Sequence, residues 1–317
     1  MSRSNVNHNF ILITGSTGYV CTHLVSRLLA STKYNIVVTY RTNRGNYNNN
    51  DRLTFKKADL LESNSFDYIF ANYQIKHVIH LAAMARVSDG ENYPEKVIAA
   101  NLVATINLAK LSVKYNIRSM IFTSSNLAQD AVSVVGLGKL LAEQYFQKID
   151  SNFTRFISLR MPNVIDSNGS VTLIFSRLIN ENKSITITHP EMSRLFITGE
   201  QSAEVLNFLM GNGIDKAVCV SYDKPIKIID LAQSMILASG KKLDTKFIGM
   251  KSGEKLTEKY FTKNEIIPAN FPKLGMIKNY KCNINIVESA IESLNKKHGI
   301  LSNALIQNIF SEIGQSF

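Results

Sequence analysis

Short apolar runs alternate along the first half of the chain with segments in which apolar residues recur every three or four positions. Phe10 to Ile13 is the first such run, and Leu24, Leu28 and Leu29 follow it at helical spacing. A run of this length predicts a buried strand, and the three-to-four spacing predicts a helix with one buried face. Strands that alternate with helices at this interval predict an α/β protein with a parallel, doubly wound sheet.

The same pattern predicts four more strands, at residues 36–40, 53–55, 78–83 and 120–122. The last of these runs into Thr123 to Asn126 at the edge of the sheet. Pro94 opens a longer helix, because proline is favoured in a first helical turn, and Asn101 interrupts the buried stripe of that helix. Residues 283–310 predict one or two amphipathic helices, which either pack on the body of the protein or form a subunit contact.

The composition is that of a globular chain with a large core. Of its 317 residues 45% are hydrophobic, enough for one large α/β unit or two closely joined domains. The formal net charge is +11, but the Lys and Arg residues are scattered, which argues against nucleic-acid binding. Cys21, Cys219 and Cys282 lie far apart, so we expect buried thiols and neither disulfides nor a metal site. No run of about 18 apolar residues occurs, which predicts a cytoplasmic protein without a membrane segment.

Candidate chemistry begins at the turn between the first strand and the first helix. We expect this turn to bind a dinucleotide through Gly15, Ser16, Thr17, Gly18, Tyr19 and Val20. Backbone N–H groups and the positive end of the helix dipole face a pyrophosphate there, and glycine lets the phosphate approach the backbone. Cys21 stands where a third glycine is usual, and the alternative interpretation is an ordinary strand-to-helix turn.

Residues after the second, third and fourth strands extend this prediction. Arg41, with Arg44 behind it, stands where a carboxylate would bind the ribose of NAD, so we expect NADP and regard NAD as the weaker choice. The alternative is a solvated loop arginine. Asp59 and Leu60 occupy the usual place for adenine contacts, although Asp59 also suits a helix cap. Leu81, Ala82 and Ala83 are small or apolar and let the cofactor lie against the fourth strand, in which His80 reads as a core histidine.

Together these residues resemble the extended short-chain dehydrogenase/reductase family. The resemblance rests on the glycine turn, Asp59-Leu60, His80 to Ala83, Asn101, Ser124-Ser125, Gly138-Lys139 and residues 159–163. Two later stretches, residues 186–203 and 248–256, are similar to the UDP-N-acetylglucosamine 4,6-dehydratase branch and its epimerase relatives in polysaccharide biosynthesis. The resemblance covers about residues 10 to 262.

The resemblance implies a Rossmann-type domain over residues 1–165 that binds NADP. It also implies a smaller substrate domain over residues 166–317 that binds a UDP-sugar, part of which packs back on the first. Asn101 and Lys139 would contact the cofactor. The substrate would contact Arg86, Asn163, Arg194, Glu254 and Lys255. The chemistry implied is transient oxidation at C4 of the sugar, in which a Tyr takes the hydroxyl proton and a Lys lowers the pKa of that Tyr.

The active segment departs from the family pattern, which has an Asp-Lys pair after the two Ser or Thr residues and then Tyr-x-x-x-Lys. Here the Asp, Lys and Tyr positions hold Asn126, Leu127 and Val135, none of which can do the proton transfer of the residue it replaces. Some members of the branch lack the Tyr and use the Asp-Lys pair, whereas this chain lacks both.

Three catalytic candidates remain in that segment. They are Ser125, which can bond a sugar hydroxyl, Lys139, and Asp130 as a substitute base. Arg86, in place of the family's Lys-His pair, can stabilise an oxyanion.

Two functions therefore stay open from the sequence. One is an NADP-dependent UDP-sugar dehydratase or epimerase with altered catalytic groups. The other is a catalytically silent NADP-binding or nucleotide-sugar-binding paralogue that acts as a partner or regulator. A homo-oligomer is compatible with either.

Overall fold

The computed structural model describes residues 9–221, 223–250, 254–258, 266–268, 270–277, 280, 285 and 303–312. Its centre is a nine-stranded sheet in the order β14-β15-β11-β6-β5-β4-β1-β2-β3. The strands from β3 to β11 along this order are parallel, and β15 and β14 add an antiparallel edge. Their bounds are β1 (Asn9–Thr14), β2 (Asn35–Tyr40), β3 (Leu53–Lys57), β4 (Gln74–His80), β5 (Ser119–Ser125), β6 (Arg155–Met161), β11 (Ala217–Ser221), β14 (Ile266–Pro268) and β15 (Leu274–Ile277).

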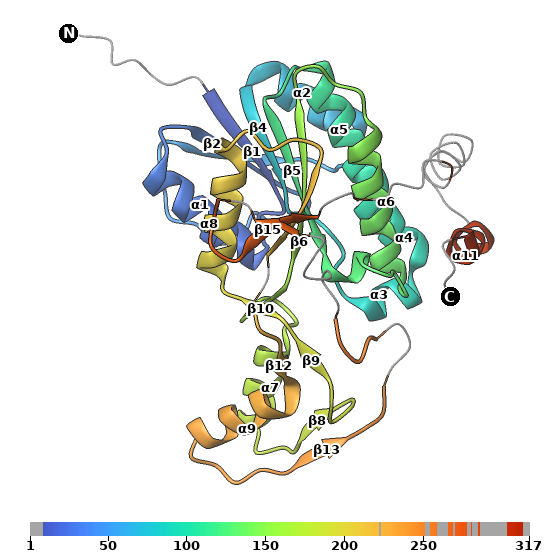
Figure 1. Ribbon diagram of the computed structural model, residues 1–317. Coiled ribbons are helices and arrows are strands. Elements are labelled where there is room, and N and C mark those ends of the chain that lie inside the picture. Colours follow the sequence, from blue (N-terminus) through green and yellow to red (C-terminus); the bar gives the residue numbers. More distant parts are fainter. Residues whose placement is uncertain are drawn as a thin grey trace.

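Helices cover both faces of this sheet (Figure 1). One face packs against α1 (Tyr19–Ser31) and α8 (Gly199–Gly211). The other packs against α2 (Ser63–Asn72), α4 (Pro94–Ile98), the π-helical turn η1 (Ala99–Val103), α5 (Ala104–Lys114) and α6 (Val134–Lys148). This arrangement is the doubly wound, Rossmann-type sheet that the sequence predicts, because apolar strands buried on both faces need a helical layer on each side.

A smaller lobe lies below the carboxyl ends of the strands in Figure 1. It contains α7 (Val171–Asn180), α9 (Ile228–Ala238) and three two-stranded sheets around a separate apolar cluster that includes Phe175 and Ile185. The sheets pair β7 (Asn163–Val164) with β10 (Phe196–Ile197), β8 (Ile185–Ile187) with β13 (Thr245–Phe247), and β9 (Ser193–Arg194) with β12 (Ile226–Lys227). In the same half of the sequence, α8, β11, β14 and β15 join the main sheet and its helical layer. The division at residue 165 into two functional domains stays a prediction.

Two strand ends differ from the sequence prediction. β4 stops at His80, so Leu81 to Ala83 follow the strand instead of ending it. β5 continues through Ser125, because Thr123, Ser124 and Ser125 still pair with residues 159–161 of β6. The polar residues of this segment are therefore held by the ladder of the sheet.

The helical run Pro94–Lys114 is long and apolar enough to cross a membrane by length and composition alone. It packs against the sheet instead, with 56% of its most apolar window buried inside the protein, as expected of a core helix. Asn101 lies in its π-helical turn, which is where the buried stripe breaks.

The C-terminal helix α11 (Asn303–Glu312) buries Ile306 and Ile309 in the cluster that holds α5 and α6. This confirms the packing interpretation for the described part of residues 283–310, of which 283–284 and 286–302 lie outside the described residues. Cys21 and Cys219 are buried free thiols, as expected, and Cys282 lies outside the described residues.

A close contact between backbones fixes the loop after β5. This loop begins with the 3₁₀ turn η2 (Asn126–Ala128), and the first turn of α6 packs against it at Gly136. A Cβ on Gly136 would lie 2.3 Å from the carbonyl oxygen of Leu127, so only glycine permits the contact.

We predict that Gly136→Ala lowers the free energy of unfolding by about 1–3 kcal/mol, because the loop or the helix must shift to relieve the overlap. Gly211→Ala is the matched control, since a Cβ there meets no atom within 4 Å. It should leave stability unchanged or raise it by up to about 1 kcal/mol. Chemical denaturation followed by circular dichroism measures both, and equal effects at the two positions would contradict the contact.

Candidate functional site

A cavity of about 270 Å³ opens at the carboxyl ends of β1, β2 and β4, where parallel α/β sheets bind ligands. The loop after β3 closes one side of it. Eight of the residues expected to bind the cofactor line this cavity: Gly15, Ser16, Thr17, Arg41, Asp59, Leu60, Ala82 and Ala83. The structure therefore brings together residues from four separate turns of the sequence.

The glycine turn has the geometry that a phosphate cradle requires. Gly15 has φ +87°, and a Cβ there would lie 2.9 Å from the backbone nitrogen of Ala82, so the turn and the end of β4 touch only because Gly15 has no side chain. Gly18 is the N-cap of α1 and provides no side-chain cap, and Tyr19 and Val20 form the first turn of the helix. The positive end of α1 thus points at the cavity without a side-chain acceptor from its N-cap.

A tyrosine that the sequence analysis missed supports the same turn. Tyr47, in the Asn-rich loop after β2, donates its hydroxyl hydrogen to the carbonyl oxygen of Ser16, and the Ser16 hydroxyl donates to the carbonyl of Asn43. Arg44 lies over the ring of Phe55, 5.5 Å from its centroid, and does not line the cavity. Its contact with the cofactor stays a prediction. Nothing in the spacing of the loop pointed to Tyr47.

Asp59 and Asn101 act on backbone groups in this structure. The Asp59 carboxylate accepts the N–H of Leu61 at 3.0 Å, which is a turn contact, while α2 has Glu62 as its N-cap. The Asn101 amide accepts the N–H of Met84 at 2.9 Å and donates to the Met84 carbonyl at 2.8 Å. Asn101 thereby fixes the segment after β4 that forms one wall of the cavity.

His80 is a core residue, as the sequence analysis favoured. Its Nδ1 lies 2.7 Å from the hydroxyl of Thr14 and its Nε2 lies 3.2 Å from that of Thr105. Burial, and secondarily the charge of Lys139, lowers the pKa of His80 to about 3, so the ring is neutral at physiological pH.

Lys139 is buried behind the end of β5. Its ammonium donates to the carbonyl of Thr123 at 2.7 Å and lies 4.6 Å from the centroid of the Phe122 ring. Burial lowers the pKa of Lys139 to about 7, while the Glu143 carboxylate opposes the change. These contacts direct the amine toward the interior, and its contact with the cofactor stays a prediction.

Val135, which stands at the position of the family tyrosine, is packed in the protein interior. Val135 is buried in the first turn of α6, and Gly90 of α3 (Val87–Asn92) lies directly over it. A Cβ on Gly90 would be only 3.2 Å from a methyl group of Val135. The helix α3 therefore covers the place from which a tyrosine side chain would emerge.

The loop after β5 rests on a buried ion pair that the sequence did not indicate. Arg160 of β6 donates from Nε and Nη2 to the two carboxylate oxygens of Glu143, at 2.9 and 2.8 Å. Ser124 and Tyr280 also donate hydroxyl hydrogens to this carboxylate. A third donor of Arg160, Nη1, holds the side-chain oxygen of Gln129.

The residues singled out in that loop lie in different surroundings. The Ser125 hydroxyl accepts the N–H of Leu127 at 3.3 Å, and Asn126 is buried with its Oδ1 accepting no hydrogen bond from the described residues. Asp130 is exposed and adopts a left-handed conformation, with φ +47°.

A cluster at the junction with the small lobe brings two predicted substrate residues together through a third residue, Glu258. Its carboxylate forms an ion pair with Nε of Arg194 at 3.3 Å. It also accepts a hydrogen bond from Nδ2 of Asn163, at 3.3 Å. The other Arg194 donors bond the carbonyls of Ser193, Lys255 and Leu256. Arg194 therefore joins β9 to the 254–258 segment, and a diphosphate would have to compete with these acceptors.

Three further residues are predicted to contact the substrate. The Arg86 guanidinium lies against Gly169, whose added Cβ would be 3.1 Å from Nε. Lys255 donates to the backbone carbonyl of Gln129, which joins the 254–258 segment to the loop after β5. Glu254 precedes it and is half-buried. Residues 251–253 of the same motif lie outside the described residues.

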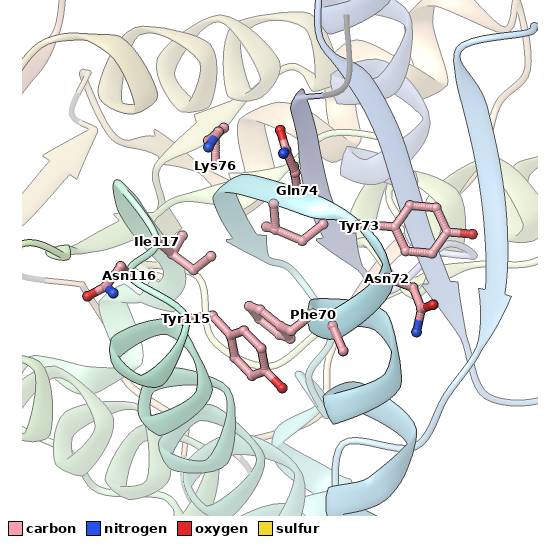
Figure 2. A pocket seen from close by; sticks show the side chains of 10 residues that line it. Phe70, Asn72, Tyr73, Gln74, Lys76, Tyr115, Asn116 and Ile117 are labelled. Carbon is pink, nitrogen blue, oxygen red and sulfur yellow. The ribbon is translucent and has the colours of Figure 1, made fainter.

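A second hollow, of about 260 Å³, lies near the amino ends of β4 and β5 (Figure 2). The ends of α2 and α5 and the start of β4 form it, with Phe70, Tyr73, Gln74, Lys76 and Tyr115 among its lining residues. It contains none of the residues expected to bind cofactor or substrate. No group of three or more metal-ligating side chains occurs in the part of the chain that the structure describes.

Fold and site together define an extended short-chain dehydrogenase/reductase. Residues 11–278 match the family model described as polysaccharide biosynthesis protein, so the chain belongs to that family.

Curated relatives agree with this assignment. The chain is 33% identical over 233 residues to the capsular polysaccharide biosynthesis protein CapD of Staphylococcus aureus, covering 69% of this chain and 39% of CapD. It is 26% identical to the probable polysaccharide biosynthesis protein EpsC of Bacillus subtilis, covering 83% of this chain and 47% of EpsC. A UDP-glucose 4-epimerase of Rickettsia rickettsii is 27% identical, with 82% and 80% covered. The chain thus spans less than half the length of the first two relatives.

Solved structures share the fold. Pen from Bacillus thuringiensis superposes with a TM-score of 0.78 at 26% identity, covering 87% of this chain and 89% of that one. UDP-glucose 4-epimerase from Thermotoga maritima, solved with UDP-glucose, has a TM-score of 0.71 at 20% identity, with 80% and 90% covered. The Thermus thermophilus UDP-glucose 4-epimerase, solved with NAD, has a TM-score of 0.70 at 18% identity, with 78% and 89% covered.

We predict that Arg194 and Glu258 are energetically coupled. Both side chains are mostly buried, at 14% and 6% exposure, so a double-mutant cycle with Arg194→Met and Glu258→Gln should give a coupling of about 1–3 kcal/mol in unfolding free energy. The exposed pair Lys227 and Glu191 in the same lobe is the control, and its cycle should give no measurable coupling. Additive effects at Arg194 and Glu258 would contradict the contact.

Proposed function

We propose that this protein modifies a UDP-sugar with NADP, by a dehydratase or epimerase reaction that oxidises C4 transiently, in surface-polysaccharide or glycan biosynthesis. The observation that carries the proposal is the cavity at the carboxyl ends of the strands, which is lined by both the glycine turn and Arg41. The relative from Rickettsia rickettsii, which is named a UDP-glucose 4-epimerase, supports the substrate class.

Residues at the cavity suit a dinucleotide. The uncapped start of α1 suits the pyrophosphate, and the glycine turn leaves room for its close approach. Arg41 at the cavity wall supports NADP, since a guanidinium can bond two oxygens of a 2′-phosphate. The nicotinamide, when bound, would accept and return a hydride at the sugar carbon.

This chain's own residues would bind and orient the reactants. Lys139 would hold the nicotinamide ribose, and the Ser125 hydroxyl would bond a sugar hydroxyl. Asn163 and Arg194 would contact the UDP-sugar, with Glu254 near its nucleotide. Arg86 would stabilise negative charge on the sugar oxygen. We propose a cytoplasmic location, a small-molecule partner, and neither nucleic acid nor membrane as a partner.

A second function is favoured by one specific observation. Val135 is sealed under Gly90, and Asn126 and Leu127 have no ionisable group, so the usual proton-transfer residues are absent from this segment. A protein that binds NADP or a nucleotide sugar without turnover, as a partner or regulator of an active paralogue, would retain the cofactor half of the site alone.

We predict that purified protein converts UDP-N-acetylglucosamine to a keto-sugar or an epimer in the presence of NADP, because both reactions begin with hydride transfer from C4 and loss of the C4 hydroxyl proton. Mass spectrometry and NMR of the sugar nucleotide detect the product. Tight binding of NADP and UDP-sugars in calorimetry without any conversion would refute the enzyme and favour the silent binding protein.

We further predict that Arg41→Ala weakens NADP binding about tenfold or more and changes NAD binding little, since the lost bonds are charge-assisted contacts to the 2′-phosphate. Arg118→Ala, at an exposed position on the opposite edge of the sheet, is the control and should change neither affinity. Isothermal titration calorimetry measures both cofactors. An equal loss for NADP and NAD would refute the NADP assignment.

A further inference from the structure

The 254–258 segment crosses from the small lobe to the loop after β5 and delivers an amine there. The Lys255 ammonium donates to the backbone carbonyl of Gln129. The side-chain oxygen of Gln129 in turn accepts a hydrogen bond from Arg160, which is buried and paired with Glu143. The Lys255 amine is therefore linked through hydrogen bonds to the buried ion pair, and its partner Gln129 is four residues from Ser125 in the chain.

Asp130 follows Gln129 and lies close to the same amine. The Gln129 amide donates to the Asp130 carboxylate at 3.4 Å, and the carboxylate is near enough to Lys255 to raise the pKa of that lysine. The backbone of Asp130 is left-handed, with φ +47°. This conformation is unusual for a residue other than glycine and is found more often at functional sites.

Four charged groups act on the Lys255 amine besides burial. Burial is the largest influence and lowers the pKa of Lys255, and Arg160 and Arg194 lower it further. Asp130 and Glu258 oppose them. A partly buried lysine held between carboxylates and guanidinium groups loses its proton at lower pH than a lysine in water.

Other ionisable groups of this region are engaged differently. Lys139 is directed inward by Thr123 and Phe122, and Glu143 is fully buried and saturated by Arg160, Ser124 and Tyr280. Lys255 and Asp130 lie together at the loop whose usual proton-transfer residues are missing.

We propose that Lys255 is the proton-transfer residue of this site and that Asp130 positions and tunes it, in place of the side chains missing at 126, 127 and 135. This inference rests on the proposed function. In the oxidation step the O–H bond of the sugar C4 hydroxyl breaks and its proton passes to the neutral Lys255 amine. The C4–H bond breaks as its electron pair and hydrogen pass as hydride to the oxidised nicotinamide dinucleotide, and the C4=O bond forms. On the return of the hydride, the Lys255 ammonium gives the proton back.

The test measures single-turnover reduction of the cofactor by UDP-N-acetylglucosamine at 340 nm, over a range of pH. Lys255→Met and Lys255→Arg should each lose at least about 100-fold in rate with unchanged NADP affinity, because neither side chain can accept the proton. Lys246→Met, at an exposed position in the same lobe, should keep the wild-type rate. Asp130→Asn should move the acid limb of the pH profile to lower pH, since the carboxylate raises the pKa of Lys255.

A second measurement does not depend on turnover. In protein whose lysines carry ¹³C-methyl groups, the NMR signal missing from Lys255→Arg identifies Lys255, and it should titrate at lower pH than Lys246. The proposal is overturned if Lys255→Arg keeps the wild-type rate, if the profile of Asp130→Asn does not move, or if Lys255 and Lys246 titrate together. A wild type that binds both ligands but reduces no cofactor would refute the proposed function, and this proposal with it.

Discussion

The buried ion pair between Glu143 and Arg160 is the interaction on which the site depends. It joins α6 to β6, and through further donors and acceptors it holds the end of β5, the loop after it and Tyr280 from the C-terminal segment. Two charges this deep pay a large desolvation penalty, which only complete hydrogen bonding offsets. Removal of one partner would leave an uncompensated buried charge, at a cost of about 3–5 kcal/mol. The pair therefore connects α6, the sheet and the loop after β5, and neither partner can be lost without exposing this cost.

The proposed site has two halves that differ in character. The cofactor half is built from backbone, with the glycine turn against the end of β4, the start of α1, and Asn101 bonded to the Met84 backbone. Such features depend on small residues and helix termini, so they persist when acid and base side chains change. The reaction half depends on individual ionisable side chains, and here Val135 is packed under Gly90 where a tyrosine would act. In the proposed function, cofactor binding and proton transfer therefore depend on different features of the structure.

Charged side chains form the contacts between the two lobes. Arg194 and Lys255, both expected at the substrate, use their donors to attach the 254–258 segment to β9 and to the loop after β5. Glu258 holds Arg194 and Asn163 together. These contacts bring Arg194, Lys255 and Glu258 together at the junction, next to the loop in which proton transfer is proposed.

The sequence by itself determined the alternation of strands and helices, the glycine turn and its neighbours along the cavity, and the loss of ionisable groups at 126, 127 and 135. Periodicity and glycine spacing are local properties, and a local pattern of apolar residues specifies local structure. Only the tertiary structure decided that Tyr47 supports Ser16, that Arg44 lies on Phe55, and that Glu143 pairs with Arg160. It also decided that Lys255 meets Gln129, 126 residues away in the chain. Such pairs join residues distant in sequence, and their partners depend on how the sheet, its helices and the small lobe pack, which no single segment encodes.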